Sequence, residues 1–186
     1  MMEAAVQLTA SEVTPIASRR PRITTADKAI VGMLGFCIVI GWSLELYWCV
    51  HRADLVPLAK TNWIANLFRI YGEADSSYFA VQSPLSLGLE TLNVFVTQFL
   101  NLWLIYAIVQ RKAYRHVLQL GIASYLTYSV IFYFWSEHLN GWGHMRVVSP
   151  WLMFLYIAPN LPWLFFHMYM IGHSGAAITK RFEAAA

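Results

Sequence analysis

Four long apolar stretches, separated by shorter polar segments, dominate the pattern of residues along the chain. They run from about 29 to 50, from 84 to 109, from about 116 to 135 and from 151 to about 171. An α-helix rises about 1.5 Å per residue, so roughly 20 apolar residues cross the ~30 Å hydrocarbon core of a bilayer. The pattern therefore predicts an all-α integral membrane protein, a bundle of four transmembrane helices.

The second stretch carries a carboxylate, Glu90, one to two turns inside one end. Helical steps of three, four and seven bring polar residues to the same side of this helix, namely Asn93, Thr97, Gln98 and Asn101. A charged group in hydrocarbon costs at least about 2.5–3.5 kcal/mol, so this polar side is expected to face other helices or a hydrated cavity. Hydrogen bonds that hold the bundle together are the alternative explanation for the amides.

A second carboxylate, Glu45, lies in the first stretch. In the predicted bundle, Glu45 and Glu90 are each about five residues from the same end of their helices, roughly 7–8 Å inside that membrane boundary. Two carboxyl groups at one depth in a medium of low dielectric constant are not expected to be charged together. One can then act as an acid and the other as a base, an arrangement suited to moving protons on an apolar substrate.

The fourth stretch brings three more candidates to one side of a helix. Asn160, Trp163 and His167 are spaced i, i+3 and i+7. Pro159 and Pro162 flank this side and can kink the helix, which would widen a cavity between neighbouring helices. These residues are expected to share a pocket with the two carboxylates, although for His167 alone a hydrogen-bonded histidine inside the bundle is the alternative.

Aromatic residues near the carboxylates can stabilise positive charge. The negative face of an aromatic ring attracts a cation, so Trp42, Tyr128 and Trp163 are candidates for holding a carbocation. Ordinary packing is the alternative for each ring. No metal or cofactor is expected, because Glu137, His138 and His144 are too loosely spaced for a zinc site.

Composition and charge support the membrane assignment and indicate a topology. The chain of 186 residues is 58% hydrophobic and 12% charged, which excludes a nucleic-acid-binding protein. About nine Lys and Arg residues lie in the two tails and the middle loop and about four in the other loops, so both termini are predicted to be cytoplasmic. We expect a mobile cytoplasmic tail at 1–27, a membrane domain at 28–173 and a short cytoplasmic tail at 174–186.

Several short motifs occur in the order of one known family. Besides Glu45, they are NLFRIYGEADSSYF at 66–79, LET at 89–91, YSVIFYFWSEHLNGW at 128–142 and PNLPW at 159–163. On these motifs, residues 29–172 resemble the emopamil-binding protein family, which has an EXPERA-type membrane domain and includes sterol Δ8-Δ7 isomerases and the sigma-2 receptor. The resemblance implies a cavity open to lipid in which an acid protonates a ring double bond and a neighbouring base removes another proton.

The resemblance also assigns roles to positions in this sequence. It implies that Glu45, Glu90 and Asn160 are catalytic, and the residues expected to bind substrate are Trp163, Tyr128, Trp42, Thr91 and His167. The sequence departs from the family where Gly41 stands in place of a histidine, one turn before the first acid, and where Val130 stands in place of an acid. His167 could supply an imidazole from across the pocket. Two acids without that histidine would also suit protonation of an epoxide or alkene to start a cyclisation.

The sequence therefore predicts an enzyme of the endoplasmic reticulum membrane that isomerises or cyclises a sterol or terpenoid through a carbocation. The main expectation is a sterol double-bond isomerase, and an epoxide-opening terpenoid cyclase is the alternative. A non-catalytic sterol-binding or trafficking protein, resembling the sigma-2 receptor, is a second alternative. The expected partners are a lipophilic substrate and the bilayer, with a homodimer as a possible assembly.

Overall fold

The computed structural model describes residues 23–79, 83–146 and 149–186. Most of the predicted tail at 1–27 lies outside these residues. Within these residues the chain is helical, and the only β-structure is an isolated bridge between Asp75 and Met145. The helices, in order, are α1 (Thr25–Ile40), α2 (Leu46–His51), α3 (Leu55–Leu58), α4 (Trp63–Tyr71), α5 (Pro84–Leu92), α6 (Gln98–Val109), α7 (Arg115–Leu139), α8 (Pro150–Ile157) and α9 (Leu161–Glu183).

Two short π-helical segments interrupt the first two long helices. The segment η1 (Gly41–Glu45) joins α1 to α2, and η4 (Asn93–Thr97) joins α5 to α6. Short 3-10 helices occur as η2 (Arg52–Asp54) and η3 (Ser76–Tyr78). A π-helical turn holds more residues than an α-helical turn and is often found at functional sites. The hydrophobic periodicity gives no sign of either π segment.

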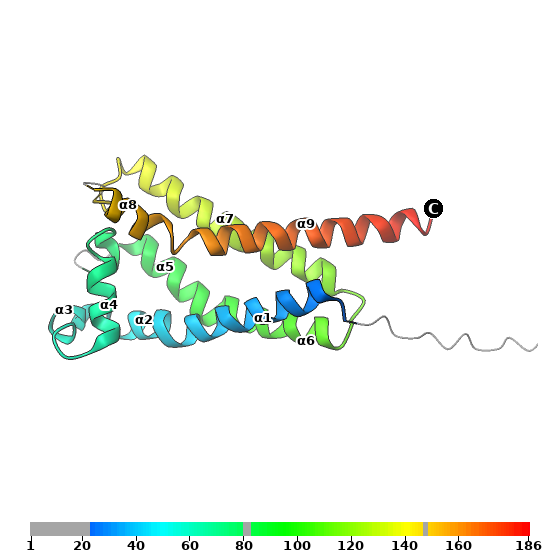
Figure 1. Ribbon diagram of the computed structural model, residues 1–186, viewed down its shortest axis with the longest axis horizontal. Helices are drawn as coiled ribbons and strands as arrows, with labels where there is room; N and C mark the ends of the chain where they lie inside the picture. The colour runs from blue at the N-terminus through cyan, green and yellow to red at the C-terminus, as the bar shows by residue number, and fades with distance from the viewer. Residues whose placement is uncertain (1–22, 80–82, 147–148) are drawn as a thin grey trace, which may run out of the picture.

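The long helices form a bundle in which α1 lies beside α6 and α7 lies beside α9 (Figure 1). One hydrophobic core joins these four helices, and its fully buried members include Ile30, Leu34, Leu104, Ile108 and Met170. The start of α1 and the end of α9 lie at the same end of the bundle in Figure 1. At that end the Arg115 guanidinium lies 3.3 Å from the buried Asp27 carboxylate. The cytoplasmic placement of both termini remains a prediction.

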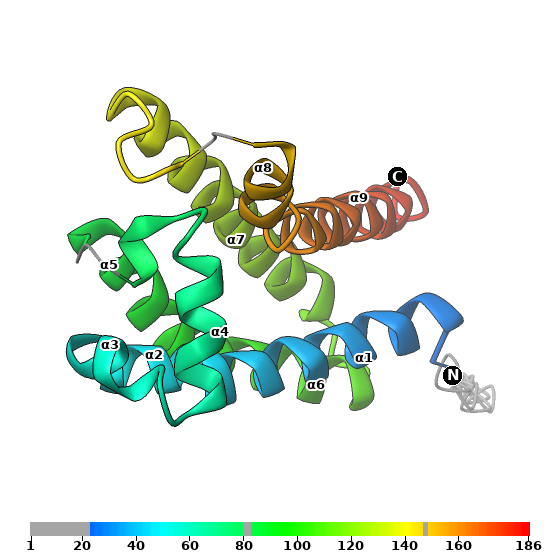
Figure 2. The same ribbon diagram turned by 60° about the vertical axis from the view of Figure 1, so that its left-hand side comes forward.

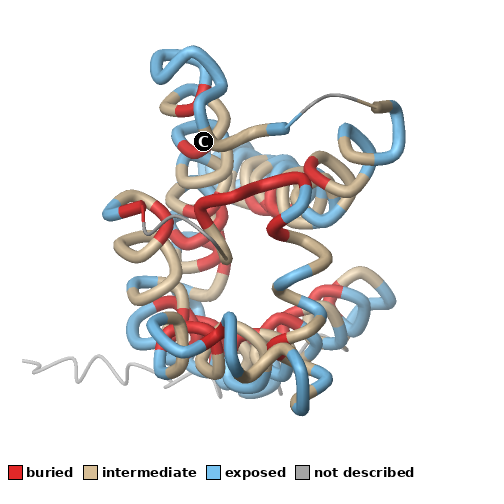
Figure 3. Tube along the Cα trace, turned by 90° about the vertical axis from the view of Figure 1, so that its left-hand side faces the viewer, coloured by how far each residue is buried: buried red, intermediate tan, exposed pale blue. Residues whose placement is uncertain are grey.

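The opposite end of the bundle is covered by two connecting segments that pair with each other. The backbone N–H of Ser76 donates to the His144 carbonyl at 2.9 Å, and that of Arg146 donates to the Ala74 carbonyl at 3.0 Å. Residues 74–77 are all buried and appear as a red stretch of the tube in Figure 3. In Figure 2, α4 also runs across this end, from the side of α2 towards α7 and α8. The first long connection thus contains a helix of its own.

Three helical segments in the described part of the chain are long and apolar enough to cross a membrane: Thr25–Leu58, Pro84–Val109 and Arg115–Leu139. The fourth apolar stretch is divided, because α8 ends at Ile157 and α9 begins at Leu161. Proline at 159 and 162 lacks the N–H that an uninterrupted helix would use. The helix α9 continues to Glu183, through most of the segment expected as a tail. A fourth membrane span remains a prediction.

Candidate active site

The two π-helical segments contact each other and form one wall of the site. The indole Nε1 of Trp42 donates a hydrogen bond to the Val94 carbonyl at 3.1 Å. Next to it, Gln98 packs directly over Gly41, so that a Cβ at residue 41 would lie 2.6 Å from Gln98 Nε2. Any residue larger than glycine at position 41, including the histidine of the resembled family, would therefore require the Gln98 side chain to move.

Glu45 accepts a hydrogen bond at the end of a chain of side-chain amides. Asn101 Nδ2 donates to Gln98 Oε1 at 3.1 Å, and Gln98 Nε2 donates to Asn93 Oδ1 at 3.2 Å. Asn93 Nδ2 in turn donates to the Glu45 carboxylate. All three amides therefore donate in the direction of Glu45. The sequence predicted the shared polar side of these residues, but it did not identify the connection to the first carboxylate.

Glu90 has a different partner and one free oxygen. The Tyr78 hydroxyl donates to Glu90 Oε1 at 2.6 Å, whereas Glu90 Oε2 is buried and has no hydrogen-bond partner. Burial and the adjacent Glu90 carboxyl raise the pKa of Tyr78, so its phenol remains a donor. Tyr78 lies within the 66–79 motif, but nothing in the sequence singled it out, because its contact with Glu90 depends on how the connection folds back over the bundle.

Both carboxyl groups line one cavity of about 270 Å³, which we call the outer chamber. It lies between the two π-containing helices, α4 and the break between α8 and α9. Asn160 and Trp163 line it together with the two glutamates, and its other walls are mostly apolar, including Leu44, Phe68, Ile70 and Leu155. An apolar cavity with a few convergent polar groups is the usual form of a site for a lipophilic ligand.

Two smaller cavities continue from the outer chamber into the bundle. The middle chamber has a volume of about 100 Å³ and shares Glu90, Asn160 and Trp163 with the outer chamber. The inner chamber has a volume of about 70 Å³ and shares Thr97 and Trp163 with the middle chamber. Trp163 therefore lines all three, and the chambers are adjacent to one another.

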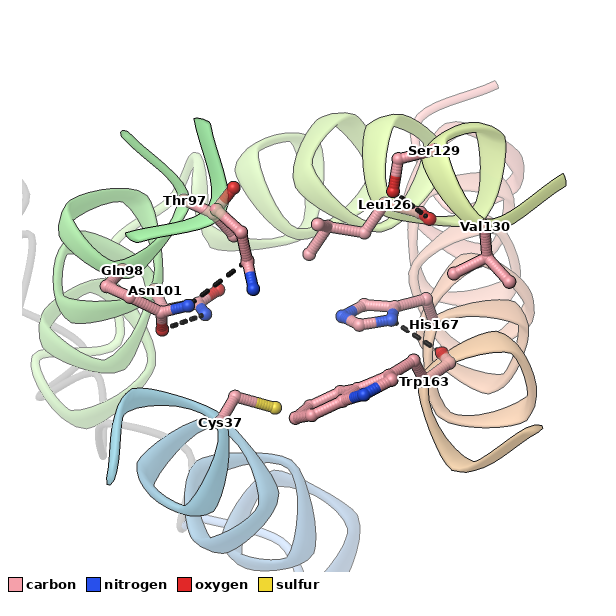
Figure 4. Close-up of a pocket in the computed structure, with 10 residues that line it drawn as sticks. Cys37, Thr97, Gln98, Asn101, Leu126, Ser129, Val130, Trp163 and His167 are labelled. Carbon is pink, nitrogen blue, oxygen red and sulfur yellow. Dashed lines mark hydrogen bonds between the residues drawn. The ribbon is translucent and has the colours of Figure 1, made fainter. Parts of the chain in front are cut away.

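Figure 4 shows the inner chamber, which His167 enters from α9. The imidazole Nδ1 lies 2.6 Å from the Trp163 carbonyl oxygen, and the opposite edge of the ring points towards Asn101 on α6. Leu126 of α7 and Cys37 of α1 complete the walls on either side. His167 is only 2% exposed. The chamber is thus built from four helices that are far apart in the sequence.

The structure brings five of the eight sequence-predicted site residues into these chambers: Glu45, Glu90, Asn160, Trp163 and His167. The Asn160 amide donates to the Tyr156 carbonyl at 2.9 Å, which fixes it beside the break between α8 and α9. The amide, indole and imidazole of the fourth stretch thus line three adjacent cavities, in agreement with the shared side that the i, i+3, i+7 spacing predicted.

The other three predicted residues do not line the chambers. Tyr128 is 62% exposed and stacks on Phe132, because α7 turns Leu126, Ser129 and Val130 inward and residue 128 lies on the far side of the helix. Trp42 is partly exposed and packs against Phe99, and the Thr91 hydroxyl donates to the Leu87 carbonyl of its own helix at 2.7 Å. Their roles in substrate binding remain predictions.

A buried carboxylate, Asp75, lies in the connecting segment that covers this end of the bundle. Asp75 accepts hydrogen bonds from the Ser77 N–H at 3.0 Å and the Ser77 hydroxyl at 2.7 Å, and also from the Tyr133 hydroxyl. Burial raises the pKa of Asp75 above its ordinary value, although these hydrogen bonds oppose the shift. Tyr133 lines the middle chamber, so Asp75 positions one of its walls.

Comparison with known proteins places these residues in a family. The sequence model of EXPERA (EXPanded EBP superfamily) matches residues 63–174, a range that contains Glu90, Asn160, Trp163 and His167 but begins after Glu45.

Three curated relatives illustrate the similarity. An isomeliandiol synthase of Ailanthus altissima is 33% identical over 92 residues, 50% of this chain and 43% of that protein. A 3-beta-hydroxysteroid-Delta(8),Delta(7)-isomerase of Cavia porcellus is 27% identical over 131 residues, 69% of this chain and 55% of that protein. A protoglabretal synthase of Ailanthus altissima is 29% identical over 97 residues, 52% of this chain and 43% of that protein. The chain spans about half the length of these relatives.

Proposed function

The chain belongs to the EXPERA family, the expanded EBP superfamily, and on that premise we propose that it is a membrane-embedded enzyme that isomerises or cyclises a sterol or terpenoid. The observation that carries the proposal is the outer chamber, where carboxyl groups from two different helices line one largely apolar cavity. We place the enzyme in the endoplasmic reticulum membrane, with both termini cytoplasmic.

The different partners of the two carboxyls support different roles. An amide N–H stabilises a charged acceptor, so Asn93 favours Glu45 as the carboxylate that acts as the base. Glu90 Oε2 is buried without a partner, and a carboxylic acid O–H at this oxygen is better tolerated there than a bare charge. Glu90 is therefore proposed as the acid, with Tyr78 fixing its other oxygen.

The reaction then follows from this geometry. The Glu90 carboxylic acid transfers its proton to one carbon of a substrate double bond, which forms a C–H bond and leaves a carbocation at the other carbon. The indole of Trp163, which lines every chamber, stabilises this cation through its π face. Glu45 removes a proton from a neighbouring carbon, and the electron pair of that C–H bond becomes the new double bond. Asn160 is proposed to position the substrate beside the two acids.

One observation favours an epoxide-opening cyclase as the second candidate. Gln98 fills the space over Gly41, where the isomerases of the resembled family carry a histidine, so no imidazole lies beside Glu45 on the same helix. In that reaction Glu90 protonates the epoxide oxygen, the C–O bond breaks, and an alkene of the same chain attacks the resulting cation. Glu45 again removes the final proton.

The test is to incubate microsomes that contain the full chain with Δ8-sterols and with epoxy-prenyl lipids in deuterated water. Carbon-bound deuterium in a double-bond-shifted sterol supports the isomerase. A ring-closed product supports the cyclase whether or not it retains deuterium, because its new hydroxyl exchanges with solvent. Glu45→Gln and Glu90→Gln are each expected to abolish formation of the labelled sterol or the ring-closed product, while Glu73→Gln, which changes an exposed glutamate, is expected to retain it. Saturable sterol binding with neither a labelled sterol nor a ring-closed product would instead identify a binding or trafficking protein.

A further inference from the structure

The inner chamber contains buried polar atoms that have no hydrogen-bond partner among the described residues. They are His167 Nε2, Thr97 Oγ1 and Asn101 Oδ1. The three residues are 1–2% exposed, and all three line the same cavity of about 70 Å³. Buried polar groups in folded proteins are nearly always hydrogen-bonded, so three orphaned atoms around one cavity indicate a polar guest.

The hydrogen bonds that His167 and Asn101 make within the protein define which donors and acceptors this guest must carry. A carbonyl oxygen can only accept, so His167 Nδ1 donates to Trp163 and Nε2 of the neutral ring is an acceptor. Asn101 Nδ2 donates to Gln98, which leaves Asn101 Oδ1 as a second acceptor. The Thr97 hydroxyl can donate or accept. A guest that donates one hydrogen bond and accepts another fits this set, whereas a purely apolar group leaves every atom unsatisfied.

The position of the chamber relates this guest to the proposed reaction. Asn160 lines the outer and middle chambers, and His167 follows it by seven residues, about 10 Å along the helix. A rigid polycyclic lipid can therefore place one end against His167 while a ring carbon lies near the carboxyl groups.

We propose that the inner chamber binds a hydroxyl group of the lipid substrate, which donates to His167 Nε2 and accepts from the Thr97 hydroxyl. The hydroxyl end then enters the bundle first, and the rest of the lipid extends through the middle chamber into the outer one. The identification of this lipid as the substrate rests on the proposed function. Recognition of the hydroxyl itself depends only on the polar atoms of the inner chamber.

The experiment compares two pairs of probes that differ by a single hydroxyl. One pair is cholest-8-en-3β-ol and cholest-8-ene, and the other is a tetracyclic triterpene alcohol and its deoxy counterpart. Equilibrium binding is measured on the full chain in lipid nanodiscs, with wild-type protein and with Glu90→Gln, in which the acid is absent. At least one alcohol is expected to bind about tenfold more tightly than its deoxy partner in both proteins, the effect of a hydrogen bond to a buried group.

Variants of the inner chamber identify the atoms responsible. His167→Phe removes the acceptor and is expected to reduce the preference for alcohol to about twofold or less. The matched control is His173→Phe on the same helix, whose ring contacts Gln119 outside the chamber and whose loss should leave the preference unchanged. Thr97→Val removes only a hydroxyl that has no partner in the protein, so it should fold normally and weaken alcohol binding about threefold or more.

Equal affinity within both pairs, no saturable binding of either alcohol, or an unchanged preference in both chamber variants would overturn the proposal and leave the chamber as a site for water. These results are distinct from the deuterium test. If the protein incorporates deuterium but binds the alcohol and its deoxy partner equally, the proposed function stands and hydroxyl recognition is excluded. If the protein prefers the alcohol but converts neither substrate, hydroxyl recognition stands and the proposed function is excluded.

Discussion

Gln98 occupies the space where a side chain at Gly41 would lie, with only 2.6 Å between its Nε2 and an ideal Cβ. The two residues belong to different helices and come together where the π-helical segments meet. A small residue in one helix thus allows an amide of the other to reach the chain that ends at the first carboxylate. Several measurable consequences follow from this and the neighbouring contacts.

Gly41→Ala is expected to destabilise the protein and to lower its activity together. The added methyl group displaces Gln98 and breaks its hydrogen bond to Asn93, at a cost of about 1–3 kcal/mol in the free energy of unfolding. Gly35→Ala is the matched control, because a Cβ at residue 35 meets nothing within 4 Å and alanine favours the helix by up to ~1 kcal/mol. Thermal unfolding in detergent and deuterium incorporation measure the two effects. Equal stability of both variants would contradict the packing argument.

Asn93→Leu is expected to reduce the rate of turnover more than it weakens substrate binding. The substitution removes the donor to Glu45 but keeps the size of the side chain, so the base loses its orientation. We expect kcat to fall about tenfold or more with little change in KM, as measured by the initial rate of deuterium incorporation. Asn66→Leu changes an asparagine that contacts Arg69 on α4 and serves as the control. A change confined to KM would exclude the proposed role.

Tyr78→Phe and Tyr128→Phe are expected to differ in their effect on activity, because only Tyr78 contacts one of the two carboxyl groups. The first variant loses the hydroxyl that donates to Glu90 at 2.6 Å, and we expect activity to fall roughly 10- to 100-fold. The second changes a ring that is 62% exposed, and activity should remain within about twofold of wild type. Parallel rate measurements on protein amounts matched by immunoblot distinguish the two. A large loss in Tyr128→Phe would restore that residue to the substrate site.

The raised pKa of Asp75 predicts that its contribution to the stability of the folded protein decreases as the pH rises. Burial raises its pKa in the folded protein above the ordinary value of 3.8. The stabilisation that Asp75 contributes is therefore fully present below its ordinary pKa of 3.8, and it is lost as the pH rises through the raised pKa of the folded protein. Asp75→Asn cannot titrate, so the stability of wild type relative to this variant should be greatest in acid and decline towards neutral pH. Unfolding temperatures of both proteins across pH 4–8 measure the difference, and a difference that grows with pH would contradict the assignment.

The sequence predicted the residues of the site better than the contacts between them. Helical spacing alone placed Thr97, Gln98 and Asn101 together, and it placed Asn160 and His167 on the side that lines the chambers. This works because each set lies on one stretch of chain, where the period of the helix fixes the direction of every side chain. The pairing of the two acids across helices came from the equal depth of Glu45 and Glu90 in the predicted bundle, and the family resemblance agreed with it.

Other features could not be predicted because they depend on how separate helices meet. The direction of Tyr128 follows from the rotation of α7 about its own axis, which is set by packing against α9. The contact between Tyr78 and Glu90 requires a connection to fold back over the bundle. The π-helical segments add residues to a turn without altering the apolar composition, so no periodicity of the sequence indicates them.

The amides that join Asn101 to Glu45 have a consequence for the fate of the reactive intermediate. Amide groups pass on hydrogen bonds but do not release protons at neutral pH, so this chain would insulate the proposed base from a hydroxyl bound in the inner chamber. In the proposed reaction the two ends of one guest would thereby be kept chemically separate, with the cation beside the glutamates and the hydroxyl beside His167.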